Sequence, residues 1–230
     1  MKTTWRTELP QLLLLVGMFL LAALTWSTAP DRIAVHWNFS GEVDRYGGKF
    51  EGLLAIPLVA LAVYLLLLFL PRIDPGRANY ASFARAYTVI RFAVLGLISA
   101  VYGMMLLWMR DHRFDVAVVA PLLVGVLMIL LGNFMGKIRP NWFVGIRTPW
   151  TLSSKLSWSR THRAGGWVFI AAGLAILLTG FLRSTRWFAL LIGLIMAGVL
   201  GLTIYSYVVW RGDPDKVPPT GTFPVDSPEE

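Results

Sequence analysis

Two polar stretches hold the side chains of this chain that could do chemistry. The longer one, residues 132–163, carries six basic residues and no acidic one, with three Trp, two Asn and two Pro among them. Guanidinium and ammonium groups bind phosphate and carboxylate, so an anion or an acidic partner is one expected ligand. The candidate binding residues here are Asn133, Lys137, Arg139, Asn141, Arg147, Thr148, Trp150, Trp158, His162 and Arg163.

A second interpretation of residues 132–163 needs no ligand. Basic residues collect on the cytoplasmic side of membrane proteins, where they set orientation and contact anionic lipid. Anchoring of this kind does not require Gly, Pro, Asn and Trp at fixed places. Recognition or a specific internal structure on one side, and simple anchoring on the other, therefore both stay open.

The shorter polar stretch, residues 31–51, offers a second set of ligand-binding candidates. His36 and Asn38 lie on the polar face of an expected strand, and Asp44 and Arg45 lie in the turn that follows. His36 and Asp44, joined by His112, could begin a metal site. Zinc usually takes three or four protein ligands, and only two His can meet here. We therefore expect no metal, and we keep open that these groups only satisfy strand-edge and turn backbone.

Enzymatic chemistry finds little support in the sequence. The chain has no Cys, and it contains no GxSxG, HExxH or GxxxxGK[ST] pattern. We expect no catalytic residue, no cofactor and no enzyme activity.

Composition indicates an integral membrane protein. Of the 230 residues, 56% are hydrophobic and only 15% are charged, whereas globular chains carry about 25% charged residues. The net charge of +8 would suggest nucleic acid as a partner in a soluble protein. In a membrane protein it more often reports topology and contact with the lipid bilayer, so we expect no direct contact with nucleic acid.

Six uncharged runs are long enough to cross a bilayer as helices at about 1.5 Å per residue. They cover residues 9–28, 52–70, 92–109, 116–131, 164–182 and 187–210. We read the first as a retained anchor and not as a cleaved signal peptide. The tail, residues 211–230, is rich in Pro and acidic residues, and we expect it to be disordered.

The polar segments carry weaker structural signals. Apolar residues at every second position from Ile33 to Phe39 predict a strand with one apolar face, capping the helices at the membrane surface. The same alternation over residues 142–146 predicts a short extended piece. Thr151 or Ser153 can then cap a helix that runs into the fifth span.

These elements predict an all-α integral membrane protein with six transmembrane helices. A short extracellular strand or hairpin forms a cap, and a structured cytoplasmic loop joins helices 4 and 5. The expected divisions are helices 1 and 2 with outer loop 29–51 in residues 1–71, helices 3 and 4 in 72–131, the loop in 132–163, helices 5 and 6 in 164–210, and the tail.

Lys and Arg counts set the expected orientation. With the N-terminus inside, the inner segments hold 14 Lys and Arg residues and the outer segments hold 7. Basic residues favour the cytoplasmic side, so both termini and residues 132–163 are expected inside, and residues 29–51 outside.

Small and charged residues add expectations about packing and transport. Gly193, Ala197 and Gly201 form one small-residue stripe, and Gly96 and Ala100 form another. Such stripes allow close helix contacts inside a bundle or at a dimer seam. The oligomeric state stays open. The six runs contain no Asp, Glu, Lys or Arg to bury, which argues against an ion-coupled transporter but not against a lipid or peptide binder.

Two segments resemble the SdpI family of membrane immunity proteins against the sporulation-delaying toxin. They are IAVHWNFSGEVDRYGGKF, similar to the family's N-terminal domain of unknown function, and GNFMGKIRPNWFVGIRTPWTLSSKLSWSRTHRAGG, similar to its C-terminal signature. The resemblance implies a multi-pass protein of the bacterial cytoplasmic membrane whose partner is a secreted, membrane-active peptide toxin. It also implies, for members that signal, capture of a small cytoplasmic helix-turn-helix repressor.

Two other functions compete with that implication. One is a transporter or binding protein for a small molecule or lipid headgroup, with the inner basic residues as its anion site. The other is a hydrolase at the membrane interface that uses His36 or His162.

Overall fold

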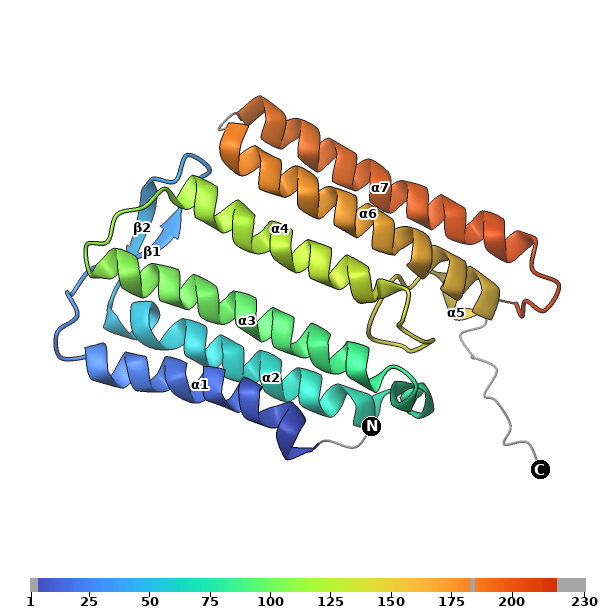
Figure 1. The fold of residues 1–230 in the computed structure, drawn as a ribbon, viewed down its shortest axis with the longest axis horizontal. Helices are drawn as coiled ribbons and strands as arrows, with labels where there is room; N and C mark the ends of the chain where they lie inside the picture. The colour runs from blue at the N-terminus through green and yellow to red at the C-terminus, as the bar shows by residue number, and fades with distance from the viewer. Residues whose placement is uncertain (1–3, 183–184, 219–230) are drawn as a thin grey trace.

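A computed structural model describes residues 4–182 and 185–218 (Figure 1). Six of its helices are long and apolar enough to cross a membrane, which confirms the predicted fold class. The long helices are α1 (Trp5–Thr25), α2 (Ile56–Ile73), α3 (Ala84–Met109), α4 (Val116–Met135), α6 (Lys155–Leu182) and α7 (Thr185–Arg211). The short elements are β1 (Ile33–Trp37), β2 (Val43–Gly47), the π-helix η1 (Glu51–Ala55), the 3₁₀-helix η2 (Arg77–Ala81) and α5 (Pro149–Leu152).

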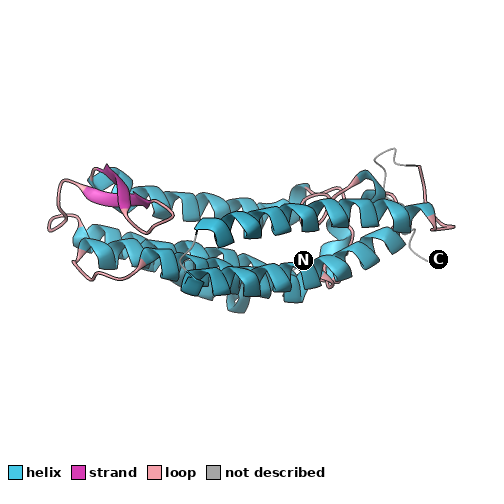
Figure 2. Ribbon diagram, turned by 90° about the horizontal axis from the view of Figure 1, so that it is seen from above, coloured by secondary structure: helices cyan, strands magenta, loops and turns pink. Residues whose placement is uncertain are grey.

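The six long helices form two groups of three. Helices α1, α2 and α3 contact one another, helix α6 contacts both α4 and α7, and contact between α3 and α4 joins the groups. Figure 1 and Figure 2 show the β1–β2 hairpin at one end of the bundle and the irregular segment after α4 at the other. The two polar stretches therefore lie at opposite ends of the molecule.

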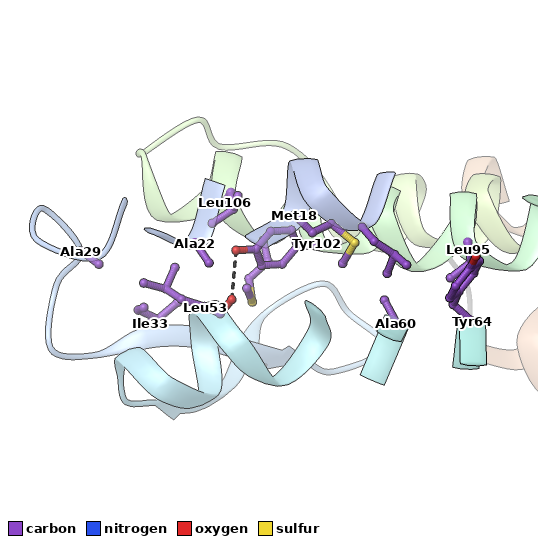
Figure 3. Packing of buried hydrophobic residues seen from close by; sticks show 12 residues of the cluster. Met18, Ala22, Ala29, Ile33, Leu53, Ala60, Tyr64, Leu95, Tyr102 and Leu106 are labelled. Atoms are coloured by element: carbon purple, nitrogen blue, oxygen red, sulfur yellow. Dashed lines mark hydrogen bonds between the residues drawn. The ribbon is translucent and has the colours of Figure 1, made fainter. Parts of the chain in front are cut away.

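Two tyrosines of α3 compensate for prolines in the second span. An α-helical carbonyl accepts from the N–H four residues later, and proline has no N–H. Pro57 and Pro71 thus deprive the carbonyls of Leu53 and Leu67 of their usual donors. Tyr102 donates its hydroxyl to the Leu53 carbonyl at 3.0 Å, inside the apolar cluster drawn in Figure 3, and a second hydroxyl, from Tyr87, reaches the Leu67 carbonyl.

Glycines bring α4 and α6 into backbone contact. A Cβ added at Gly132 would lie 2.6 Å from the Gly166 carbonyl oxygen, and one added at Gly125 would lie 2.8 Å from that of Gly173. Two antiparallel helices therefore meet through small residues seven positions apart on each, the kind of contact that drives association in lipid.

The small-residue stripes predicted as packing surfaces lie elsewhere. A Cβ added at Gly96, Gly193 or Gly201 would meet nothing within 4 Å, and Ala197 is exposed. The expectation of contacts inside the bundle is wrong for the α7 stripe and for Gly96. Spacing in the sequence alone did not distinguish these small residues from the glycines of α4 and α6, which do pack against another helix.

The hairpin differs from a regular two-stranded sheet. Its antiparallel register is irregular between Ala34 and Trp37, which breaks the expected alternation. Ile33 and Ala34 are both buried, and Phe39 is 78% exposed where an inward position was expected. Asp44 and Arg45 belong to β2 and not to the turn.

Contacts at its turn end hold the hairpin on the bundle. The Trp37 ring packs edge-on against Trp108 of α3, with ring centroids 5.7 Å apart. In the turn, Gly41 has a positive φ of 79° and approaches the start of α4, where its Cβ position is 2.9 Å from the Ala117 nitrogen. The hairpin thus bridges the two helix groups.

The described part of the tail is packed, contrary to the prediction of disorder from residue 211. Asp213 is buried and accepts a hydrogen bond from Ser154, and the Val217 N–H donates to the Ser153 carbonyl at 3.1 Å. The remaining tail, residues 219–230, lies outside the described residues.

The glycine contact gives a matched test. Gly132→Leu would force a side chain into the Gly166 backbone, where overpacking costs about 1–3 kcal/mol or more, whereas Gly193→Leu enters open space. We expect the first variant to lower the unfolding temperature of the purified protein clearly. The second should keep a free energy of unfolding within about 1 kcal/mol of wild type, and so nearly the same unfolding temperature. Equal unfolding temperatures for the two variants would contradict the α4–α6 contact.

Candidate functional site

Residues 132–163, here called the signature segment, are only partly a loop. They comprise the end of α4, an irregular stretch of residues 136–148, α5, and the first turns of α6. The extended piece expected over residues 142–146 is absent, and bends occupy these positions. The alternation of apolar residues reflected a folded turn and not a strand.

Asn141 builds that turn from within. Its side chain is fully buried. The amide nitrogen donates to the carbonyls of Arg139 and Val144, both at 2.9 Å. The amide oxygen accepts from the backbone N–H groups of Phe143 at 2.9 Å and Val144 at 2.6 Å. Buried irregular backbone must be hydrogen-bonded, and one asparagine meets much of that requirement here.

Asp74, just after α2, ties this turn to the first helix group. Its buried carboxylate accepts from the Tyr80 hydroxyl at 2.8 Å, the Trp142 N–H at 3.1 Å and the Gly76 N–H at 2.6 Å. Burial and the neighbouring carboxylate raise the pKa of Tyr80, so its hydroxyl remains a donor. The side chain of Asn79 adds a hydrogen bond to the Pro140 carbonyl at 2.8 Å.

His162 fixes the end of the turn on α6. Its Nε2 accepts from the Ile146 N–H at 3.0 Å, so Nε2 carries no proton, and Nδ1 lies 2.8 Å from the Trp158 carbonyl, to which it donates. The ring stacks on Trp158 at 4.0 Å between centroids. Gly145, with φ of 114°, passes so close that a Cβ there would overlap Nε2. Both ring nitrogens serve the fold, which does not favour a hydrolase that uses His162.

Helix caps join the signature segment to α7. Thr148 caps α5 by accepting from the Thr151 N–H at 3.1 Å, and Ser154 accepts from the Ser157 N–H at 2.8 Å. The predicted caps, Thr151 and Ser153, were wrong by a few positions. Thr148 and Ser157 also bind Ser206 of α7, at 2.9 Å and 2.7 Å.

The predicted inner residues therefore fall into two sets. Buried within the signature segment are Asn141, Thr148, Trp158 and His162. Exposed on its surface are Asn133, Lys137, Arg139, Arg147 and Arg163. Trp150 is half-buried, with its ring 5.2 Å from that of Tyr207. Specific internal structure thus accounts for the first set, and the second remains available to a partner.

The exposed cations keep their charge uncompensated by acidic neighbours. Across the described ranges, no ion pair involves Lys137, Arg139, Arg147 or Arg163. The ammonium group of Lys137 lies 4.5 Å from the Phe134 ring centroid, and Arg147 donates to the Trp142 carbonyl. The end of the bundle opposite the hairpin thus presents positive charge on a hydrogen-bonded turn.

The outer candidates sit on the hairpin with different roles. His36 Nδ1 and Asp44 Oδ1 are 2.6 Å apart, and both side chains are exposed. Asn38 organises the turn, with its amide oxygen accepting from Ser40 at 2.9 Å and Glu42 at 3.0 Å. Arg45 pairs with Glu51 of η1. Within residues 4–182 and 185–218, no three His, Asp or Glu side chains gather as metal ligands.

Sequence reasoning missed a buried ion pair inside the first helix group. Arg91 of α3 is fully buried and binds Glu8 of α1 bidentately, with nitrogen–oxygen distances of 3.0 and 2.8 Å. The Tyr64 hydroxyl of α2 donates to the same carboxylate at 3.0 Å. Three helices meet at this carboxylate.

The expectation that no spanning segment buries a charge is therefore wrong. It used uncharged runs as helix bounds, whereas α1 begins at Trp5 and α3 at Ala84, so both charges lie inside candidate spans. One signal in the sequence could have predicted the pair. An acidic residue lies near the end of one span, and a basic residue lies near the end of another.

Comparisons with known proteins agree with the resemblance read from the sequence. Residues 137–206 match the SdpI/YfhL protein family, and residues 13–61 match a domain of unknown function, DUF1648. The immunity protein SdpI of Bacillus subtilis (strain 168) is 23% identical over 201 residues, covering 84% of this chain and 90% of the relative. No solved structure matches the chain. The predicted resemblance is confirmed.

The Glu8–Arg91 pair predicts a non-additive mutational response. Arg91→Met leaves a buried carboxylate unpaired, which costs about 3–5 kcal/mol of stability, whereas apolar replacement of both partners is often nearly neutral. We expect Arg91→Met to lower the unfolding temperature more than the double variant Glu8→Leu/Arg91→Met. Asp111→Ala, which breaks the exposed pair with Arg113, should change stability by less than about 1 kcal/mol. Additive losses at Glu8 and Arg91 would show that the two charges are not coupled.

Proposed function

We propose that this chain, which carries the sequence patterns of the SdpI family at both ends of its bundle, protects a bacterial cell from a secreted, membrane-active peptide. The observation that carries the proposal is that the two matched segments bracket one six-span bundle. One match includes the exposed hairpin, and the other begins in the signature segment and runs into α7. The relative that aligns over most of the chain is named an immunity protein.

The proposed orientation puts the hairpin outside the cell and both termini inside. The excess of Lys and Arg in the inner segments supports it. The uncompensated cations of the signature segment lie at the end of the bundle opposite the hairpin. The reverse orientation would put that charge on the outer face.

The hairpin, which carries the outer candidates His36, Asn38, Asp44 and Arg45, is the proposed contact for the peptide toxin. Beside the exposed His36–Asp44 pair it carries Phe39, 78% exposed, and Tyr46, 50% exposed. Charged and aromatic groups together on one surface suit an amphipathic peptide. The contacts of Trp37 with α3 hold this surface in place, which reduces the ordering cost of binding.

The signature segment is the proposed surface for an intracellular partner, such as a small helix-turn-helix repressor. Arg139 and Arg147 are exposed on a turn that Asn141 and Asp74 hold rigid. A rigid basic surface favours an acidic partner surface.

One observation supports the competing transporter function. Charged groups within spans are frequent in ion and substrate pathways, and Glu8 and Arg91 are such groups. Their bidentate pairing leaves no net charge, which favours a structural role. Uptake of a labelled anion by liposomes that hold the purified protein, abolished by Arg91→Met but not by Asp111→Ala, would support transport instead.

Toxin challenge tests the immunity proposal. A sensitive strain that expresses this chain should survive purified sporulation-delaying toxin, and a His36→Ala/Asp44→Ala variant should lose most of that protection because the outer contact is altered. The matched control is Asp111→Asn, which breaks the exposed pair with Arg113 at the same end and leaves the contact of Arg113 with Trp108 in place. Membrane levels of each variant are measured by immunoblot.

Three outcomes decide between the roles. Loss of protection in the hairpin variant alone, at equal membrane levels, supports contact with the peptide. Equal loss in both outer variants would assign the effect to general charge at this end. No protection by the unmodified chain would overturn the proposal for this toxin.

A further inference from the structure

One side of the α4–α6 contact carries exposed cations near one end of the helices and exposed apolar residues farther along them. The two helices are antiparallel and touch at Gly132 and Gly166 and at Gly125 and Gly173. A helix turns by about 100° per residue. In an antiparallel pair, the residues that directly follow the contact residues on both helices therefore point to the same side of the contact line.

We call that side the seam face and define it by six exposed residues. They are Val126 and Asn133 of α4, Lys137 in the turn that directly follows α4, and Arg163, Trp167 and Leu174 of α6. That turn lies beside α6, since a Cβ added at Gly136 would be 3.7 Å from the Arg163 Cα. Asn133 and Val126 directly follow contact glycines of α4, and Trp167 and Leu174 directly follow those of α6. Arg160, one turn before Arg163, is exposed and lies on the same side. Helix α7 packs on another side of α6, against Gly165 and Val168.

The chemistry of the seam face changes with depth. At the inner end lie Lys137, Arg160 and Arg163, none of them in an ion pair within the described residues. Trp167, 71% exposed, lies one turn deeper into the span. Exposed Trp is typical of the headgroup level.

Deeper still, the seam face becomes aliphatic. Val126 and Leu174 are 51% and 52% exposed on the two sides of the Gly125–Gly173 contact. At about 1.5 Å per residue, the rise from Arg163 to Leu174 is about 16 Å. One leaflet's hydrocarbon is about 15 Å thick, so this length matches a single acyl chain.

We propose that the seam face binds one anionic phospholipid. Its phosphate lies between Lys137, Arg160 and Arg163, its interfacial region lies beside Trp167, and one acyl chain follows Val126 and Leu174. Charge complementarity selects an anionic headgroup, and the aliphatic track selects a lipid over a soluble anion. The lateral position separates this site from Arg139 and Arg147, which belong to the irregular turn at the end of the bundle.

Lipid titration of the detergent-purified full chain tests this proposal. Native mass spectrometry follows binding of palmitoyl-oleoyl phosphatidylglycerol and of the matching phosphatidylcholine. We expect phosphatidylglycerol to bind roughly 10-fold tighter or more. The Lys137→Gln/Arg163→Gln variant should lose roughly 10- to 30-fold in that affinity, since each of the two removed cations contributes roughly fivefold in attraction to an anionic lipid.

The matched control removes equal charge from the same end of the molecule. Arg139→Gln/Arg147→Gln should change phosphatidylglycerol affinity by less than roughly threefold, because a direct contact with the phosphate contributes more than a solvent-exposed charge beside it. Inorganic phosphate at about 10 mM should not displace the lipid, because solvent-exposed cations bind a soluble anion only weakly. Arg160→Gln alone provides a milder variant if the double variant fails to fold.

Three results would overturn the proposal. Equal affinity for the two lipids would remove the headgroup selection. Equal loss in the two double variants would assign binding to the net charge of the inner end. Displacement by inorganic phosphate would indicate an anion site without lipid selectivity. Toxin protection is expected to persist in the seam-face variant, so this test is independent of the immunity proposal.

Discussion

Backbone that leaves helical geometry beside a bilayer needs hydrogen-bond partners within the protein, because lipid supplies none. The signature segment meets that constraint through a few buried side chains. Asn141 binds four backbone groups of one turn, and Asp74 and His162 attach that turn to α2 and α6. The rest of this end of the bundle depends on these bonds, because they fix the positions of its exposed cations.

The same constraint explains features of the spans. Prolines in the second span leave carbonyls without donors, and tyrosines of α3 supply hydroxyls. A buried arginine and glutamate neutralise one another where α1, α2 and α3 meet. Glycines let α4 and α6 approach until their backbones touch. Each polar or close contact thus joins segments far apart in the sequence.

The number of spans, the presence of the hairpin and the family resemblance of the chain could be predicted from the sequence. Hydropathy and charge counts depend only on local composition, so they locate segments reliably. Roles within the segments could not be predicted. Arg147 and His162 both read as ligand candidates, yet one is exposed and the other holds a backbone N–H. That difference depends on partners distant in sequence, as does the Glu8–Arg91 pair.

In the proposed immunity function, the hairpin is the outer surface that meets the peptide. Its contacts with α3 and α4 hold that surface in position. The signature segment has a comparable organisation at the other end, with a buried polar interior and a charged exterior. The account therefore depends on these two ends facing opposite sides of the membrane.

Accessibility of single cysteines measures that arrangement most directly, because the chain contains no Cys. Ser40→Cys lies in the exposed hairpin turn and Asp215→Cys lies in the exposed part of the described tail. A membrane-impermeant maleimide should label the first in intact cells and the second only after permeabilisation. Labelling of Asp215→Cys in intact cells, with Ser40→Cys protected, would contradict the account.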